Sequence, residues 1–395
     1  MRSARILGSG PSSYYHVLSR VIERRFILGE QEQEHFKKLM RAQEAFSGVR
    51  VLTWNCMSNH FHMLVAVENR ESEEVQAELA RLLVDDAAFL QRLKPVYSAD
   101  ALEGIGKMLR VIRGEEAAGV ASKRPVSPVS MAAAEFVVEG DDLANLEDAE
   151  NGNDVFSTDC PGTTRQEEIA RFKQPYLDRL YDLSAFVGEI KQRFSQWYNL
   201  RNDRLGPLWE DRFKSVLVQG EPGVLATVAA YIDLNAVRAG IVKDPREWRW
   251  CGYAEALKGQ GLARNGVYEV LGEAEAPRRD GEAWRKVHRR YRRLLMEEGV
   301  QSRDEDGRIV RKGLTPEEFA TEEARDFELP APALLRHRIA YFVNGLALGS
   351  AAFVEDVFAK NRTRMGVKRS TGARVPKPVL GGLRTLRDLR GGIGR

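Results

Sequence analysis

Two β-type runs joined by a short polar connection constrain the fold of this chain most strongly. The first run covers residues 49–54 (Val-Arg-Val-Leu-Thr-Trp), and the second covers residues 60–67 (His-Phe-His-Met-Leu-Val-Ala-Val). β-Branched and aromatic residues of this kind favour strands. The connection over residues 55–59 contains Ser58-Asn59 and has a length typical of hairpin loops. The sequence therefore predicts an antiparallel hairpin over residues 49–67.

The flanking segments extend the hairpin into an alternating pattern of strands and helices. A β-rich run precedes it over residues 14–18, and apolar residues at helical spacing cover residues 31–45. Helical patterning continues after the hairpin to about residue 113 and resumes over residues 169–198. A strand over residues 213–218 is followed by a helix that opens after Pro222 and ends at Gly240. This order predicts an α+β fold, a ferredoxin-like antiparallel sheet with helices.

The 395 residues exceed one typical domain, so we expect one core domain with additions. The core is predicted in two parts, residues 1–113 and 165–257. Residues 114–164 between them are predicted to be a flexible acidic insertion, because no Lys or Arg occurs from residue 135 to 159 and apolar periodicity is missing. Residues 258–395 are predicted to be a basic, partly helical C-terminal extension, with a basic helix over residues 284–293 and two short helices over residues 334–358.

Composition excludes several classes of protein. The three cysteines, Cys56, Cys160 and Cys251, are odd in number and far apart, which argues against a disulfide framework and a cysteine-type zinc site. No window reaches the roughly 20 apolar residues that cross a bilayer, and the N-terminus lacks a secretory signal. We therefore expect a cytoplasmic protein without membrane contact. The net charge of +3 is too small to establish a nucleic-acid partner by itself.

The histidines of the second run are the first candidates for chemistry. His60 and His62 are two positions apart on a predicted strand, so both imidazoles project from one face while Phe61 enters the other. Two adjacent neutral imidazoles make an effective pair of divalent-metal ligands. The alternative is two surface histidines on a half-exposed strand. Their position in a strongly apolar run, in a chain with six histidines, supports the metal site about as well as this alternative.

A second candidate pair lies on the helix that follows Pro222. Tyr231 and Asn235 stand at i and i+4, so a phenol and an amide share one helical face. The alternative is a tyrosine packed between helix and sheet with an asparagine that caps a local turn. Tyr198 and Asn202 repeat the same spacing and form a weaker rival pair. The other four histidines have no paired geometry and are interpreted as structural, namely His16, His35, His288 and His337.

Four segments in chain order resemble the single-tyrosine transposases of the HUH class (the IS200-like transposase domain), with the REP-associated tyrosine transposases as the nearest branch. The resemblance covers about Tyr14 to Tyr253, interrupted by the insertion. The segments are Tyr-His-Val at 15–17, Trp-Asn-Cys-Met-Ser-Asn-His-Phe-His-Met-Leu-Val at 54–65, Gly-Pro-Leu-Trp-Glu-Asp-Arg-Phe-Lys at 206–214 and Tyr-Ile-Asp-Leu-Asn-Ala-Val-Arg-Ala-Gly-Ile-Val at 231–242.

The resemblance implies a role for each candidate residue. His60 and His62 fall on the family's metal-binding pair, Tyr231 falls on its nucleophile, and Asn235 falls on its third metal ligand. The implied activity is cleavage and transfer of single-stranded DNA through a 5′-phosphotyrosine link, with Mg²⁺ or Mn²⁺ as cofactor and no nucleotide cofactor. Two motifs depart from the family. The sequence has Asn-Ala where the family usually has Asn-Pro, and Trp-Cys-Gly-Tyr at 250–253 where the family usually has Trp-Ser-Ser-Tyr.

Basic and aromatic residues around the fourth predicted strand are candidates for DNA binding. Cations that follow phosphates, interleaved with aromatics that stack on bases, suit single-stranded or hairpin DNA. The alternative is a solvated basic loop with core aromatics. The predicted contacts are Arg201, Arg204, Trp209, Arg212 and Lys214. For assembly, a homodimer is the expectation.

Two other functions compete with transposition. A domesticated protein could keep the fold and bind DNA hairpins without moving DNA. A metallohydrolase could use His60 and His62 with a metal-bound water, but it would need acidic ligands, and Glu68 is the nearest carboxylate in sequence. The hydrolase would also leave the Tyr231 and Asn235 pair unused.

Overall fold

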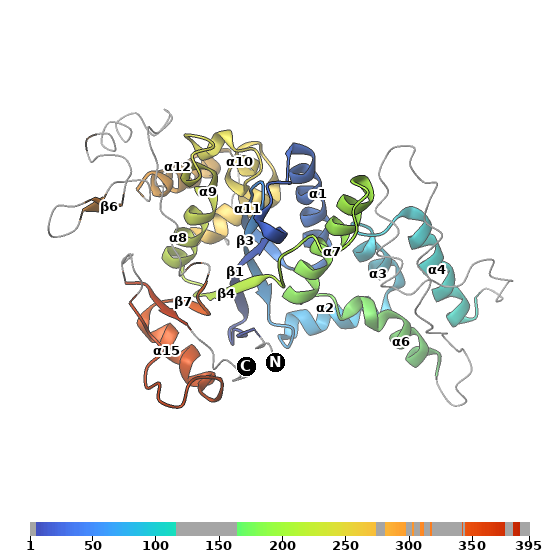
Figure 1. Cartoon of the computed structure of the whole chain (residues 1–395). Helices are drawn as coiled ribbons and strands as arrows, with labels where there is room; N and C mark the ends of the chain where they lie inside the picture. Colours follow the sequence, from blue (N-terminus) through green and yellow to red (C-terminus); the bar gives the residue numbers. More distant parts are fainter. Residues whose placement is uncertain are drawn as a thin grey trace. The chain divides into compact units, whose positions relative to one another are not determined.

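A six-stranded sheet with strand order β2-β3-β1-β4-β7-β8 organises the part of the chain that contains the predicted hairpin (Figure 1). The computed structural model describes residues 5–115, 164–273, 281–297, 302–303, 309–311, 317, 342, 344–375 and 382–387. The strands are β1 (Ser12–Arg20), β2 (Arg50–Cys56), β3 (His60–Glu68), β4 (Lys214–Val218), β7 (Ala347–Gly349) and β8 (Arg384–Leu386). A separate antiparallel pair consists of β5 (Ser302–Arg303) and β6 (Ile309–Arg311).

The central four strands confirm the predicted α+β architecture. β2 and β3 form the antiparallel hairpin, and β1 pairs antiparallel with both β3 and β4. β7 differs, because it joins the edge of β4 in parallel and makes the sheet mixed. Three residues, Ala-Leu-Gly, are too short to show the alternation that identifies a strand, so helices were expected here. The helix instead begins after Ser350, whose hydroxyl accepts the Phe353 N–H at 3.2 Å, and α15 covers Ala351–Lys360.

The described residues divide into two compact units. The first unit contains the sheet and comprises residues 1–37, 50–69 and 207–395. Its helices are α8 (Pro222–Asp233), α9 (Asn235–Arg238), α10 (Gly252–Leu257), α11 (Gly261–Val270), α12 (Gly281–Glu297) and α15. The predicted helix up to Gly240 is thus two consecutive helices, and Gly240 has a positive φ of 71°, as a helix-terminating glycine does.

The second unit comprises residues 38–49 and 70–206 and is helical. Its helices are α2 (Glu73–Val84), α3 (Asp86–Leu93), α4 (Ala99–Arg113), α6 (Arg165–Leu177) and α7 (Leu183–Arg201), and α1 (Glu30–Ser47) crosses the boundary between the units. The predicted helix over 169–198 is broken between α6 and α7. Tyr181 adopts a φ of 56°, and the Asp182 carboxylate accepts the Ala185 N–H at 2.6 Å, which starts a new helix. Nearly all of the predicted insertion, residues 116–163, lies outside the described residues.

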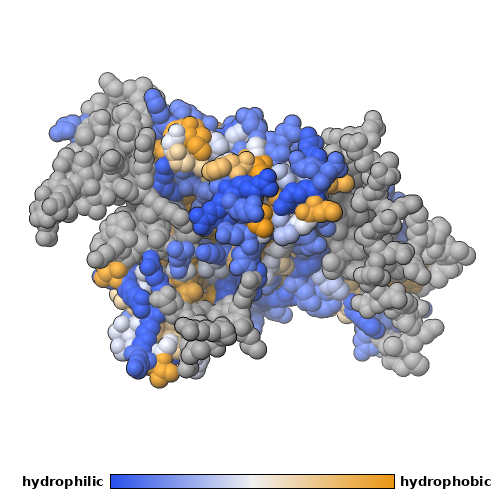
Figure 2. Space-filling model, viewed as in Figure 1, coloured by the Kyte–Doolittle hydropathy of each residue, from blue (hydrophilic) through white to orange (hydrophobic). Residues whose placement is uncertain are grey.

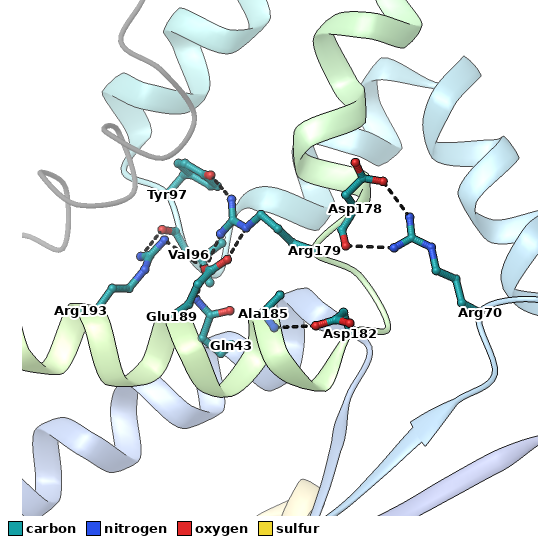
Figure 3. Close-up of polar contacts among 10 residues, drawn as sticks. All are labelled: Gln43, Arg70, Val96, Tyr97, Asp178, Arg179, Asp182, Ala185, Glu189 and Arg193. Atoms are coloured by element: carbon teal, nitrogen blue, oxygen red, sulfur yellow. Dashed lines mark hydrogen bonds and ion pairs between the residues drawn. The ribbon is translucent and has the colours of Figure 1, made fainter. Parts of the chain in front are cut away.

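A network of charged side chains joins the helices of the second unit (Figure 3). The guanidinium of Arg179 contacts the Glu189 carboxylate and donates to the Tyr97 hydroxyl at 2.5 Å. Gln43 donates to the same carboxylate at 2.8 Å, and Arg193 donates to the backbone carbonyl of Val96 at 2.9 Å. Because these groups are largely removed from water, their mutual contacts replace the hydration that they lose.

The two faces of the sheet are covered by different elements of the first unit. On one face, Phe36 of α1 packs against Phe61, with ring centroids 4.6 Å apart. On the other face, the Thr53 hydroxyl donates to Asp233 at 2.7 Å, and the Asn55 amide donates to the Ile232 carbonyl at 3.0 Å. These two contacts hold the C-terminal end of α8 over β2 and its neighbour β3.

The predicted basic helix is α12, and part of it belongs to the core. Tyr291 donates to the Asp233 carboxylate at 2.5 Å, and Arg292 forms a buried bidentate ion pair with Asp244. Its other cations, including Arg285 and Lys286, are exposed. Among the described residues, no helix has the length and apolarity that spanning a membrane requires. Hydrophilic side chains dominate the coloured surface in Figure 2, with small, separate hydrophobic areas.

Candidate active site

The two predicted metal ligands occupy the start of β3, on the face that α8 covers. His60 is the first residue of the strand and is half-buried, whereas His62 is 3% exposed. Their ring centroids are 5.0 Å apart. The strand alternation predicted from the sequence therefore brings both imidazoles together on one face.

The end of α8 brings the second candidate pair to the histidines. The Asn235 amide nitrogen is 3.1 Å from the Nε2 of His60. The Tyr231 ring lies edge-on to His62, with centroids 6.2 Å apart, and is 6% exposed. Residues more than 160 positions apart in sequence thus form one cluster, as expected for two halves of a single site.

The rival pair on α7 has a different environment. The Asn202 side chain donates to the backbone carbonyl of Tyr198 at 2.8 Å, and the Tyr198 ring stacks on Phe194 at 16°. These contacts are local to one helix. The Asn202 amide caps the end of that helix, and the Tyr198 ring packs against its neighbour.

Asn59 fixes the tautomer of His60. The Asn59 amide nitrogen donates to the Arg24 carbonyl at 3.1 Å, so its oxygen is the atom that faces the Nδ1 of His60 at 2.6 Å. A carbonyl oxygen can only accept, so the Nδ1 of His60 carries the hydrogen and donates. The Nε2 of neutral His60 then has a lone pair, which is the form that binds a metal.

His16 belongs to the same cluster, although the sequence led us to interpret it as an isolated structural histidine. Its Nε2 lies 2.8 Å from the Nδ1 of His62, and its Nδ1 lies 2.7 Å from the backbone carbonyl of Phe342. Burial lowers the pKa of His16 to about 4 and lowers the pKa of His62 well below its ordinary value. Both rings are therefore neutral near pH 7.

Two arginines lie beside the cluster. The guanidinium of Arg238 lies 3.9 Å above the Tyr231 ring and donates to the Asn235 amide oxygen at 3.1 Å. Arg20 is directly opposite His60 in the pairing of β1 with β3. Both cations contribute to the low pKa of His62. Sequence reasoning missed them, although Arg238 stands three residues after Asn235, one helical turn away.

The predicted DNA contacts lie in different surroundings. Lys214 is exposed and is opposite Leu18, which in turn is opposite His62, so Lys214 shares the face of His62 two strands away, at about 10 Å. Arg212 is exposed on the preceding turn. Trp209 is 8% exposed and packs edge-on against Phe61, with centroids 5.5 Å apart, as a core residue does.

The remaining two predicted DNA contacts lie in the helical unit. Arg201 is exposed at the end of α7, with its guanidinium 5.9 Å from the Trp197 ring centroid. Arg204 is partly buried and donates to the Asn199 side chain at 3.0 Å. Both side chains are therefore engaged close to their own helix terminus.

The donor set fits a divalent cation in part. The Nδ1 of His60 faces Asn59 and the Nδ1 of His62 faces His16, so each neutral ring can offer its Nε2 lone pair, which is the donor that a divalent metal accepts. The Asn235 amide directs its nitrogen to His60 and its oxygen to Arg238, so binding through oxygen requires the amide to turn. No group of three or more His, Cys, Asp or Glu residues suited to a metal occurs among the described residues. A site here would therefore combine two imidazoles with an amide.

Comparison with known proteins gives one match. Residues 10–76 match the family model described as Transposase IS200 like. The match includes β1, β2, β3 and both histidines, and it ends before Tyr231 and Asn235. No curated protein and no solved structure matches the chain. Residues 10–76, which contain the two histidines of the site, are therefore similar to an IS200-like transposase domain.

Proposed function

We propose that the protein cleaves and transfers single-stranded DNA in a metal-dependent reaction, with Tyr231 as the nucleophile. One observation supports this proposal most directly. A helix far along the chain puts Tyr231 and Asn235 against the two histidines of the transposase-like segment, with Asn235 3.1 Å from His60. A phenol beside two imidazoles that can bind a metal suits metal-assisted attack by a tyrosine on a phosphodiester.

The proposed reaction exchanges one phosphate ester for another. The Tyr231 oxygen forms a bond to phosphorus, the bond from phosphorus to the 3′ oxygen breaks, and the phenolic proton ends on that 3′ oxygen. The products are a free 3′-hydroxyl and a 5′-phosphotyrosine, and the reverse reaction with a new 3′-hydroxyl joins two strands. The ester energy is kept, so no nucleotide is consumed.

Each residue of the site has its own role in the proposed reaction. His60, His62 and the turned amide of Asn235 would hold Mg²⁺ or Mn²⁺, which supplies charge that offsets the charge at phosphorus. Arg238 lies over the Tyr231 ring, where its guanidinium can donate to a phosphate oxygen. Arg20 and Lys214 add positive charge on the same face of the sheet.

For the DNA, we propose a path of phosphates over this face, with Lys214 and Arg212 as contacts. Arg201 and Arg204, in the helical unit, are proposed as further DNA contacts. Trp209 can stack on a base only if it leaves Phe61, so Trp209→Leu should weaken the fold more than DNA binding. The proposed assembly is a homodimer, which sedimentation tests directly.

A covalent adduct tests the proposal. The protein is incubated with 3′-labelled single-stranded hairpin DNA and Mn²⁺, because the 5′-phosphotyrosine retains the 3′ fragment, and a labelled protein–DNA species that survives denaturation is sought. We expect the adduct in the wild type, its loss in Tyr231→Phe, and its retention in Tyr198→Phe. Tyr198 is a matched control because it is a buried helical tyrosine with the same asparagine spacing.

The two competing functions give different results. Cleavage that continues unchanged in Tyr231→Phe would replace our proposal with a metallohydrolase. Hairpin binding without any cleavage in the wild type would replace it with a domesticated DNA-binding protein. A reduced adduct in Arg238→Met, with hairpin affinity retained, would support the proposed role of Arg238 in the chemical step.

A further inference from the structure

His16 occupies a buried position between the site and the C-terminal extension. It lies on β1 and is 2% exposed. One ring nitrogen faces the Phe342 carbonyl at 2.7 Å, and the other faces the Nδ1 of His62 at 2.8 Å. The His16 and His62 rings are nearly parallel, with an interplanar angle of 24° and centroids 5.0 Å apart. The three groups form one chain of direct hydrogen bonds.

The polarity of this chain follows from its first member. The Phe342 carbonyl can only accept, so the Nδ1 of His16 must carry the hydrogen. A neutral imidazole has one N–H, so the Nε2 of His16 is an acceptor. The Nδ1 of His62 must then donate to it, and the hydrogen of His62 is on Nδ1. The opposite tautomer would put two lone pairs face to face in a buried place, which costs about the free energy of a lost buried hydrogen bond.

We propose that His16 is a positioning residue that, anchored by the backbone carbonyl of Phe342, holds His62 in the tautomer whose Nε2 can bind the metal. The inference rests on the proposed function, because it takes His62 as a metal ligand. Asn59 does the same for His60, so each histidine has its own orienting acceptor. His16 differs from Asn59 in that its own orientation depends on a residue of the C-terminal extension.

The same residue of the extension also contacts the nucleophile. The Phe342 ring lies 4.5 Å from the Tyr231 ring, while its carbonyl holds His16. A segment far from the transposase-like region therefore contacts both His16 and Tyr231. Loss of the chain of hydrogen bonds should therefore weaken metal binding without removal of any metal ligand, by the 10- to 100-fold typical of such orienting partners.

Two substitutions separate an orienting role from a packing role. His16→Gln retains the polarity, because its amide nitrogen can donate to Phe342 and its oxygen can accept from His62. His16→Leu introduces an apolar side chain of similar volume and removes both hydrogen bonds. We expect Mn²⁺ affinity, measured by electron paramagnetic resonance with Mn²⁺ alone, to fall about 10- to 100-fold in His16→Leu and to change less than threefold in His16→Gln.

Nitrogen-15 NMR of the metal-free protein, labelled only at its six histidines, reads the tautomer directly. We expect His62 as the Nδ1–H form in the wild type and in His16→Gln, and as a mixture in His16→Leu. His288, which hydrogen-bonds to Tyr253 at 2.9 Å, serves as the unaffected control. This measurement uses no metal and no DNA, so it stands apart from the adduct assay.

An Nε2–H form of His62 in the wild type would overturn the inference, as would His16→Leu protein that binds Mn²⁺ as tightly as the wild type. If His16→Leu does not fold, the wild-type tautomer and His16→Gln decide. A wild type that has the expected tautomer but neither binds Mn²⁺ nor forms an adduct would refute the proposed function and leave the hydrogen-bond chain intact.

Discussion

Gly266 is a position where one added methyl group should disturb the sheet. It lies in α11, and a Cβ atom there would stand 2.1 Å from the Leu52 carbonyl oxygen, 2.7 Å from its carbon and 2.8 Å from its Cα. All three atoms are backbone atoms of β2, so no rotamer change can relieve the overlap. β2 pairs with β3, which carries His60 and His62.

The size of the effect can be worked from these distances. Ordinary contact begins at 3.4 Å, so Gly266→Ala requires helix and strand to separate by 3.4 − 2.1 = 1.3 Å at this point. Overpacking typically lowers the free energy of unfolding by about 1–3 kcal/mol. We expect about 3 kcal/mol here, because the added methyl group meets backbone atoms that cannot move aside. Alanine recovers about 1 kcal/mol through its higher helix propensity. The net loss is about 2 kcal/mol, or a fall in Tm of roughly 6 °C for a domain of this size.

Circular dichroism melting of Gly266→Ala measures this loss, and hydrogen exchange of the residue 50–56 peptide locates it. Gly188→Ala is the matched control, because Gly188 is also inside a helix and a Cβ there meets nothing within 4 Å. The control should gain up to about 1 kcal/mol. Gly266→Ala protein that melts at or above the wild-type temperature, with unchanged exchange in β2, would refute the reasoning.

Three further predictions follow from buried groups. Burial raises the pKa of the Cys56 and Cys251 thiols, so the reactive thiolate is scarce at pH 8. Alkylation of the folded protein, followed by mass spectrometry, should be at least about tenfold slower than alkylation of the protein unfolded in urea. Equal rates would contradict this. Lys173→Met should lower the free energy of unfolding of the second unit by about 3 kcal/mol. The reason is that the fully buried ammonium pairs with the Asp86 carboxylate at 2.7 Å and donates to two backbone carbonyls. An unchanged melting curve would exclude this role. Tyr291→Phe should lower the free energy of unfolding by about 1–3 kcal/mol and speed hydrogen exchange in α12, because the buried Asp233 loses a hydrogen-bond donor. Exchange at the wild-type rate would show that other contacts hold α12.

The hairpin and the same-face placement within each of the two candidate pairs could be predicted because each has a strong local signal. Residues 60–67 form one apolar strand, and strand alternation alone puts His60 and His62 on the same face. Tyr231 and Asn235 needed only helical spacing. Local spacing could not predict that the histidine pair contacts the pair formed by Tyr231 and Asn235. That contact was predicted through the family resemblance, and it depends on α8 crossing the same face of the sheet that carries the histidines.

His16 and β7 escaped prediction for a different reason. His16 becomes interpretable only when the register of β1 with β3 is known, because its neighbour across the strands is Leu64 and its hydrogen bond runs diagonally to His62. Sequence periodicity says which face a strand residue occupies, and it says nothing about which residue lies beside it. β7 pairs with β4 along two residues and with β8 along three, both distant in sequence, so its strand state comes from tertiary contact.

Asp233 contributes to holding the end of α8 against the sheet. It lies between Tyr231 and Asn235 in sequence, and its carboxylate points away from them, to Thr53 on β2 and Tyr291 on α12. Burial raises its pKa to about 6, so the carboxylate is charged near neutral pH and is held by these hydroxyl donors. The side chains of residues 231–235 therefore point to two different sides of the helix. One side anchors the helix to the sheet and to the C-terminal extension, and the other side presents the phenol and the amide to the histidines. Because α12 and Phe342 both contact this arrangement, the extension is part of the structure that sets the geometry of the site.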